Sequence, residues 1–89
     1  MYYTYVLYSE KFNQIYVGHS KNLNKRVKEH NLGLSSSTKR YIPWELAYDE
    51  KFSTRSEAMK REKELKSSRG RNFIWNEIIK KKYNVFIPR

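Results

Sequence analysis

The N-terminal part of the chain constrains the fold most, because two strand patterns follow one another across a short polar connection. Residues 2–8 (YYTYVLY) are rich in aromatic and β-branched side chains, which favour strands. Residues 15–18 (IYVG) repeat this character after the polar stretch SEKFNQ. A connection of this length is typical of an antiparallel hairpin, so we expect the chain to begin with one.

Beyond the hairpin, the pattern predicts a helix, a strand and two further helices, at residues 21–31, 44–52, 55–66 and 72–81. Ser20 is the expected N-cap of the first helix. Thr54 and Glu57 form a T-x-x-E capping box before the second helix, and residues 67–71 (SSRGR) are expected to break that helix, with Gly70 as its stop. The order β-β-α-β-α-α predicts an α/β (α+β) fold, in which a small three-stranded antiparallel sheet is flanked by helices.

The length and the missing cysteines limit what the chain can be. With 89 residues, we expect one domain over residues 1–89. The absence of cysteine excludes disulfides and thiolate metal sites. No stretch has the pattern of a signal peptide or the roughly 20 apolar residues of a membrane span. A soluble, cytoplasmic protein without a membrane partner is therefore expected.

The charge is strongly positive and unevenly distributed. The chain has 19 Lys and Arg against 9 Asp and Glu, a net charge of +10. Most of the excess lies in residues 20–40 and 55–82, which are largely the predicted helices. A field of this sign attracts polyanions, so nucleic acid, in particular DNA, is the favoured partner, ahead of an anionic membrane or an acidic protein.

In the first predicted helix, an arginine and a histidine lie at the edge of the apolar stripe. With Leu23 at zero, a turn of about 100° per residue places His30 near −20° and Arg26 near −60°. Together they could be presented to one phosphate, since Arg binds phosphate oxygens and His transfers protons near neutral pH. The same spacing is also compatible with a packed histidine and a surface arginine.

In the second predicted helix, a carboxylate lies within the apolar face. With Ala58 at zero, Glu62 falls near 40° and Leu65 near −20°. A buried carboxylate costs several kcal/mol unless a cation or hydrogen bonds satisfy it. The partner of Glu62 could be an internal cation such as Arg26 or Arg61, or a hard divalent metal ion.

Four segments, in order, resemble the GIY-YIG nuclease domain: YTYVLYS, IYVG, NLNKRVKEH and SEAMKREKELK. The resemblance extends over nearly the whole chain, and the spacings L-x-x-R-x-x-x-H and A-x-x-x-E are its most specific parts. More narrowly, the chain is similar to short stand-alone proteins related to the nuclease domain of the excision-repair incision subunit. This resemblance implies a role in DNA repair.

The resemblance implies an endonuclease that hydrolyses DNA phosphodiester bonds with one Mg²⁺ or Mn²⁺ ion. The implied catalytic residues are Tyr5, Tyr16, Arg26 and His30, with Gly18 as a structural motif residue and Glu62 as the metal ligand. Six cations are expected to contact the flanking nucleic-acid backbone: Lys25, Lys28, Lys39, Arg40, Lys60 and Lys63.

The sequence departs from the family pattern in three respects. The first motif reads Tyr3-Thr4-Tyr5, without the glycine and isoleucine of the family name. Asn72 and Asn76 bracket the region where larger members carry a further polar residue, but neither has the expected spacing. Larger members usually add a separate DNA-binding domain, and we expect none here, so we expect low sequence specificity, or specificity supplied by a protein partner.

Two other functions are compatible with these observations. The chain could be a non-catalytic nucleic-acid-binding protein that retains the fold, with Tyr8, Phe12 or Trp44 stacking on unpaired bases. It could also be a basic partner subunit of a DNA repair complex. Metal-dependent cleavage would distinguish the nuclease from both.

Overall fold

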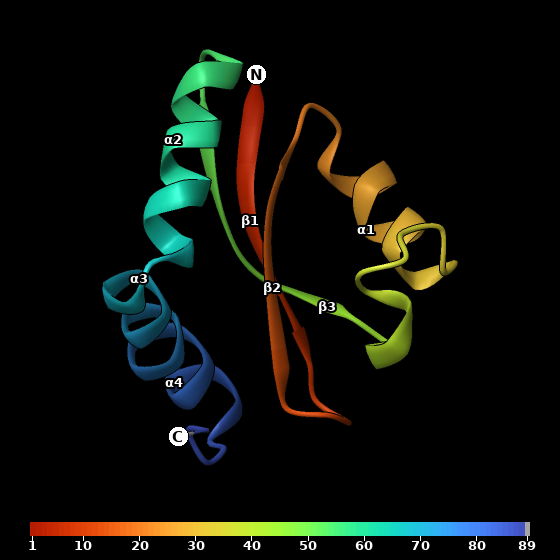
Figure 1. The fold of residues 1–89 in the computed structure, drawn as a ribbon, viewed down its shortest axis with the longest axis vertical. Coiled ribbons are helices and arrows are strands. Elements are labelled where there is room, and N and C mark those ends of the chain that lie inside the picture. The colour runs from red at the N-terminus through yellow and green to blue at the C-terminus, as the bar shows by residue number, and fades with distance from the viewer. Residues whose placement is uncertain (89) are drawn as a thin grey trace.

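A three-stranded antiparallel sheet has a helical region on each side (Figure 1). The computed structural model describes residues 1–88. The strand order is β2-β1-β3, so the first strand is central. The strands are β1 (Tyr2–Ser9), β2 (Gln14–Ser20) and β3 (Glu45–Phe52). This confirms the predicted hairpin and the predicted fold class.

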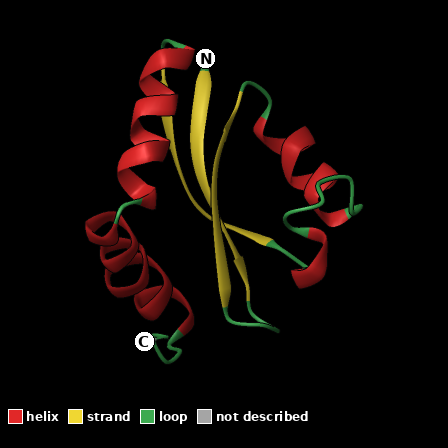
Figure 2. Cartoon of the chain, viewed as in Figure 1, coloured by secondary structure: helices red, strands yellow, loops and turns green. Residues whose placement is uncertain are grey.

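The helices lie on both sides of the sheet (Figures 1 and 2). One side carries α1 (Leu23–Asn31), and a short 3₁₀ segment, η1 (Lys39–Tyr41), follows in the loop before β3. The other side carries α2 (Arg55–Lys66), α3 (Ser68–Phe73), a π-helical segment η2 (Ile74–Ile79) and α4 (Lys80–Tyr83). The predicted order β-β-α-β-α-α is therefore observed.

The start of α1 differs from the prediction. Ser20 is the last residue of β2, and the N-cap is Asn22, whose side chain accepts a hydrogen bond from the backbone N–H of Lys25 at 3.1 Å. Asn and Ser are comparable caps, so local preference did not decide between them. In α2 the predicted capping box is present, with reciprocal bonds between Thr54 and Glu57.

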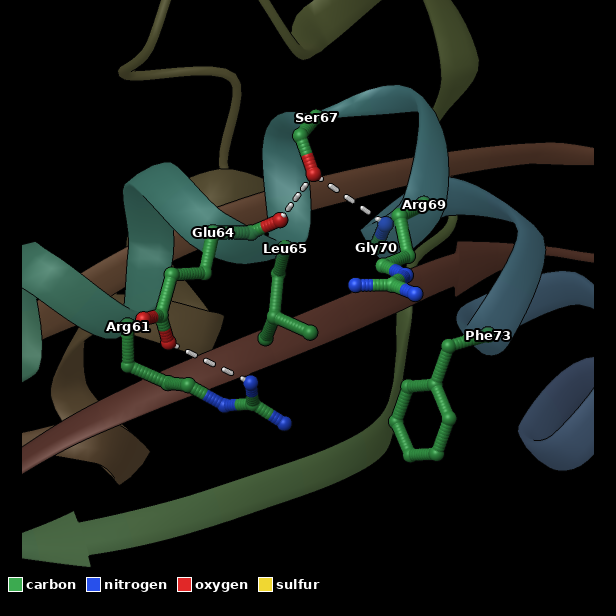
Figure 3. Close-up of a pocket in the computed structure, with 7 residues that line it drawn as sticks. All are labelled: Arg61, Glu64, Leu65, Ser67, Arg69, Gly70 and Phe73. Carbon is green, nitrogen blue, oxygen red and sulfur yellow. Dashed lines mark hydrogen bonds and ion pairs between the residues drawn. The ribbon is translucent and has the colours of Figure 1, made fainter.

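The prediction for Gly70 was wrong. It lies inside α3, whose N-cap is Ser67, so the last helical region begins four residues earlier than expected. Figure 3 shows Gly70 next to Leu65, where α2 and α3 meet. A Cβ atom at Gly70 would lie 2.2 Å from the backbone oxygen of Glu64. This glycine permits a close approach of two backbones rather than ending a helix.

Alternation along β1 divides the core into two clusters. Tyr5 and Leu7 face α1 and pack with Trp44, whereas Val6 and Tyr8 face α2 and pack with Leu65 and other apolar residues. Tyr8 and Trp44 are buried, so they are not available to stack on bases. Of the three aromatic residues considered for stacking, Phe12 alone is exposed, at 41%.

None of the helices within residues 1–88 combines the length and the apolar character needed to cross a lipid bilayer.

Candidate active site

The pairing of β1 with β2 places Tyr5 directly opposite Gly18. The phenol of Tyr5 lies over the glycine: a Cβ atom at Gly18 would be 2.7 Å from its hydroxyl oxygen and 3.1 Å from the Tyr16 ring. No other residue leaves room for both rings. The predicted structural role of Gly18 thus has a physical cause, which is the space needed by the two motif tyrosines.

A buried chain of hydrogen bonds extends from this phenol. The Tyr5 hydroxyl lies 2.9 Å from Nε2 of His30, and Nδ1 of His30 lies 2.8 Å from the hydroxyl of Thr38. The indole N–H of Trp44 donates to the backbone oxygen of Thr38 at 2.9 Å. The side chains of Tyr5, His30 and Thr38 are all buried. Such a network holds its members in fixed orientations.

This burial changes the expected arrangement of Arg26 and His30. The sequence suggested that both could be presented to one phosphate, but His30 is fully buried and turned toward Tyr5, whereas Arg26 is partly exposed. Burial, followed by the positive charge of Arg26, lowers the pKa of His30. The imidazole is therefore neutral at pH 7, and Arg26 is the member of the pair that can reach a phosphate.

The two motif tyrosines have different surroundings. Tyr5 is 1% exposed, and burial is the main cause that raises its pKa to about 12. Tyr16 is only partly buried, with its ring centroid 5.0 Å from that of His30 and 6.4 Å from that of Tyr5. Tyr5 is thus a protonated, enclosed phenol at neutral pH, and Tyr16 is the phenol that solvent can reach.

Arg26 lies at the rim of an open, mostly basic depression. Its guanidinium pairs with Glu29 at 3.2 Å. The depression is lined by residues from the end of β2, from α1 and from the start of α2: His19, Ser20, Lys21, Asn22, Lys25, Arg26, Glu29 and Arg55. A surface of this composition suits the sugar–phosphate backbone of a nucleic acid.

The six cations predicted to contact nucleic acid are all exposed, but they do not line one depression. Lys25 lines the depression beside Arg26. Lys60 lines a different one, together with Glu50 and Glu57. Lys28, Lys39, Arg40 and Lys63 line neither.

Glu62 lies on the α2 side of the sheet, with both oxygens occupied. One oxygen is 2.5 Å from Nδ1 of His19, and the other is 2.5 Å from the ammonium group of Lys66. Arg61, considered above as a partner, instead binds Glu50 at 3.1 Å. Partial burial tends to raise the pKa of Glu62, but the hydrogen bonds from Lys66 and His19 hold it below its usual range.

The charge of Glu62 also acts on the α1 side. Besides burial, which dominates, the negative charge of Glu62 contributes to the raised pKa of Tyr5. His19 follows Gly18 directly on the edge strand β2 and faces the opposite side. The carboxylate and the phenols therefore belong to opposite faces, but the charge of Glu62 still acts on the Tyr5 phenol.

A metal ion at this edge would have one protein ligand. Within residues 1–88, no group of three or more His, Cys, Asp or Glu side chains could hold a metal. Mg²⁺ needs only one or two carboxylates, because water and substrate phosphate fill its other positions. Glu62 fits this pattern once Lys66 releases its oxygen, and Lys66 is 50% exposed and free to turn away.

Sequence reasoning missed His19 and Thr38. Alternation along β2 could have placed His19 on the face opposite Tyr16 and Gly18, once the strand extends to Ser20. Thr38 had no sequence signal, because it lies in an irregular loop whose path depends on Trp44. Asn72 and Asn76 lie away from the site and bond to each other, the Asn76 side chain donating to the Asn72 oxygen at 2.8 Å.

Comparison with known proteins identifies relatives of the same short type. The chain is 43% identical over 58 residues to UPF0213 protein SSP2268 of Staphylococcus saprophyticus, covering 64% of this chain and 71% of that protein. It is 46% identical over 54 residues to UPF0213 protein SERP0126 of Staphylococcus epidermidis, covering 60% and 66% of the two chains. The matched segment thus spans about two thirds of each relative.

A solved structure has a similar fold. The solution NMR structure of UPF0213 protein BH0048 from Bacillus halodurans superposes with a TM-score of 0.51 at 27% identity, covering 86% of this chain and 85% of that one. The model of the GIY-YIG catalytic domain matches residues 1–84. Since this match extends over nearly all of the sequence and includes every residue of the site, the chain belongs to the GIY-YIG catalytic domain family, within the nuclease superfamily.

Proposed function

We propose that this protein is a metal-dependent endonuclease that hydrolyses DNA phosphodiester bonds with low intrinsic sequence specificity. The observation that carries the proposal is that, besides burial, Tyr16, Arg26 and Glu62 all act on the pKa of Tyr5, which is hydrogen-bonded to His30 in the buried network. A phenol, a guanidinium and a carboxylate provide a proton acceptor, a phosphate ligand and a metal ligand. Phosphodiester hydrolysis requires these three roles.

The substrate would bind through its backbone. Arg26 provides a planar fork that matches two phosphate oxygens, and it stays charged at any working pH. Lys21, Lys25 and Arg55 line the same depression and would contact neighbouring phosphates. Contacts to phosphates position a nucleic acid but do not read its bases, which is the physical reason for low specificity. A protein partner would then supply any specificity.

In its phenolate form, Tyr16 would accept the proton of the attacking water and become a neutral phenol. Both motif tyrosines are candidates by sequence, but Tyr5 is enclosed and holds its proton, with a pKa of about 12. Tyr16 is reachable from solvent and packs against His30. His30 stays neutral and keeps the hydroxyl of Tyr5 in place beside Gly18. The phenols would therefore have separate roles, one reactive and one positioning.

Glu62 would hold the metal, with His19 fixing one of its oxygens and Lys66 leaving the other. When bound, Mg²⁺ or Mn²⁺ would supply positive charge against which the phosphate can react. Arg26 would stabilise the same developing charge from the α1 side.

A cleavage assay tests this function. Supercoiled plasmid and branched DNA are incubated with wild type, Glu62→Ala and Glu64→Ala, each with Mg²⁺, with Mn²⁺ and with EDTA. Glu64 is the matched control, because it lies on the same helix but is 53% exposed and pairs with Arg61. We expect cleavage by wild type and Glu64→Ala only with metal, and a loss of at least about 100-fold in Glu62→Ala. Equal cleavage by all three proteins would indicate a contaminant or a wrong site.

One observation favours a second candidate, a nucleic-acid-binding protein without catalysis. Both oxygens of Glu62 already have partners, a hydrogen bond with His19 and an ion pair with Lys66, an arrangement that needs no metal. This candidate predicts DNA binding that weakens with salt, is unaffected by EDTA and produces no cut strands. The same assay, with binding measured in parallel, separates the two.

A further inference from the structure

We propose that Thr38 is a positioning residue that fixes the tautomer of His30, by accepting the Nδ1 hydrogen so that Nε2 accepts the hydroxyl hydrogen of Tyr5. The tautomer itself is a property of the folded chain. Its kinetic consequence rests on the proposed nuclease function.

Hydrogen-bond accounting favours this tautomer. The Tyr5 hydroxyl has one proton to donate, and in residues 1–88 its hydrogen-bond acceptor is Nε2 of His30, at 2.9 Å. The neighbouring guanidinium of Arg26 carries only donors, so it cannot take that proton. If Nε2 were protonated, the buried Tyr5 hydroxyl would lose its acceptor, and a buried donor without a partner destabilises the folded state.

The contacts of Nδ1 on the His30 ring agree with the tautomer that is protonated at this nitrogen. Nδ1 then carries the proton, and the Thr38 hydroxyl oxygen is 2.8 Å away to accept it. The hydroxyl hydrogen of Thr38 has its own acceptor, the backbone oxygen of Ser35, at 3.4 Å. In this direction the donors of Tyr5, His30 and Thr38 all have acceptors, whereas in the reverse direction the hydroxyl hydrogen of Tyr5 has none.

The loop places Thr38 through contacts outside the network. Gly33, with φ of +78°, follows α1 and turns the chain back toward the sheet. Trp44 then fixes the loop, because its indole donates to the Thr38 oxygen and its backbone pairs with the Asn31 side chain at 2.7 and 2.9 Å. The position of Thr38 is thus set by the fold and is independent of any substrate.

Nitrogen-15 NMR of the ring tests the tautomer without any activity. In wild type we expect a protonated-type signal at Nδ1 of His30 and an unprotonated-type signal at Nε2. Thr38→Ser keeps a hydroxyl and should keep this pattern. Thr38→Val removes the hydroxyl, so both tautomers of His30 should be populated. The Nδ1 and Nε2 signals should then shift toward each other. Ser37→Ala, which removes an exposed hydroxyl from the same loop, is the matched control and should match wild type.

Cleavage kinetics provide the second readout. We expect Thr38→Val to lower kcat by up to about tenfold with little change in KM, and Thr38→Ser to restore it. A wild-type ring protonated at Nε2, or an unchanged pattern in Thr38→Val, would overturn the proposal. If Thr38→Val does not fold, the spectra of wild type and Thr38→Ser still show which ring nitrogen of His30 is protonated. If no variant cleaves DNA but the expected nitrogen pattern is found, the nuclease function fails and the tautomer assignment stands.

Discussion

On the α1 face of the sheet, Tyr5, His30 and Thr38 form a closed chain of hydrogen bonds from which solvent is excluded. On the α2 face, Glu62 is 19% exposed and is held partly by Lys66, which is 50% exposed. A buried polar network is costly to disturb, whereas an exposed ion pair contributes about 0–1 kcal/mol and exchanges readily. The sheet thus has a rigid face, where His30 is held between Tyr5 and Thr38, and a face where Glu62 can exchange Lys66 for another partner.

Substitution of Tyr16 should have the largest effect on the cleavage rate, because Tyr16 is the partly exposed phenol beside the buried network of Tyr5, His30 and Thr38. We expect Tyr16→Phe to lower the cleavage rate by about 100-fold or more, because a general base contributes 10²–10⁴-fold. DNA affinity and thermal stability should stay close to wild type, since the ring is retained. Tyr48→Phe, on β3, is the control for loss of a phenol hydroxyl. Full activity in Tyr16→Phe would assign the proton transfer elsewhere.

Removing the centre of the buried network should destabilise the protein. His30→Leu leaves the hydroxyls of Tyr5 and Thr38 without their partner, so we expect a loss of about 2–4 kcal/mol in the free energy of unfolding. Urea denaturation measures it, with Asn24→Ala on the exposed side of α1 as the control. A loss below about 0.5 kcal/mol would mean that the network is not preorganised.

Gly18 tests the close packing of the motif tyrosines on the α1 face. Gly18→Ala places a methyl group where 2.7 Å separates it from the Tyr5 hydroxyl, and we expect a loss of about 1–3 kcal/mol from overpacking. Combining it with Tyr5→Phe removes the nearest clashing atom, so the two changes should be non-additive by at least about 0.5 kcal/mol. Simple additivity in the double variant would contradict the close packing.

The ion pair of Glu62 with Lys66 should give the smallest change in stability. Burial tends to raise the pKa of Glu62, yet Lys66 and His19 hold it below its usual range. A lowered pKa stabilises the folded protein above the unfolded pKa, and the contribution is lost as pH falls through the folded pKa. Lys66→Met should therefore lose under about 1 kcal/mol near pH 7, and less at acidic pH.

The same variant should bind Mn²⁺ more tightly, because Lys66 no longer competes for the carboxylate. Calorimetric titration measures the affinity, with Lys81→Met, which breaks another i,i+4 pair with Glu77, as the control. Unchanged affinity would argue against Glu62 as the metal ligand.

Much of the fold was readable from local patterns, and the errors have identifiable causes. The hairpin and the capping box at Thr54 and Glu57 depend on neighbouring residues, and both were confirmed. Gly70 was misread as a helix end, because its role is a tertiary contact with the backbone of Glu64. The exposure of Tyr8 and Trp44 was misjudged for a similar reason, since the second layer of helices and the loop cover them.

The sequence by itself determined the order of the elements and the direction in which Glu62 and His30 point, because helical and strand periodicity follow from backbone geometry alone. Only the tertiary structure decided their partners. It brought His19 to Glu62 across 43 residues and Thr38 to His30 through a loop without regular pattern. Hydrogen bonds and ion pairs act over about 3 Å, and the sheet and the loop bring these groups within that distance.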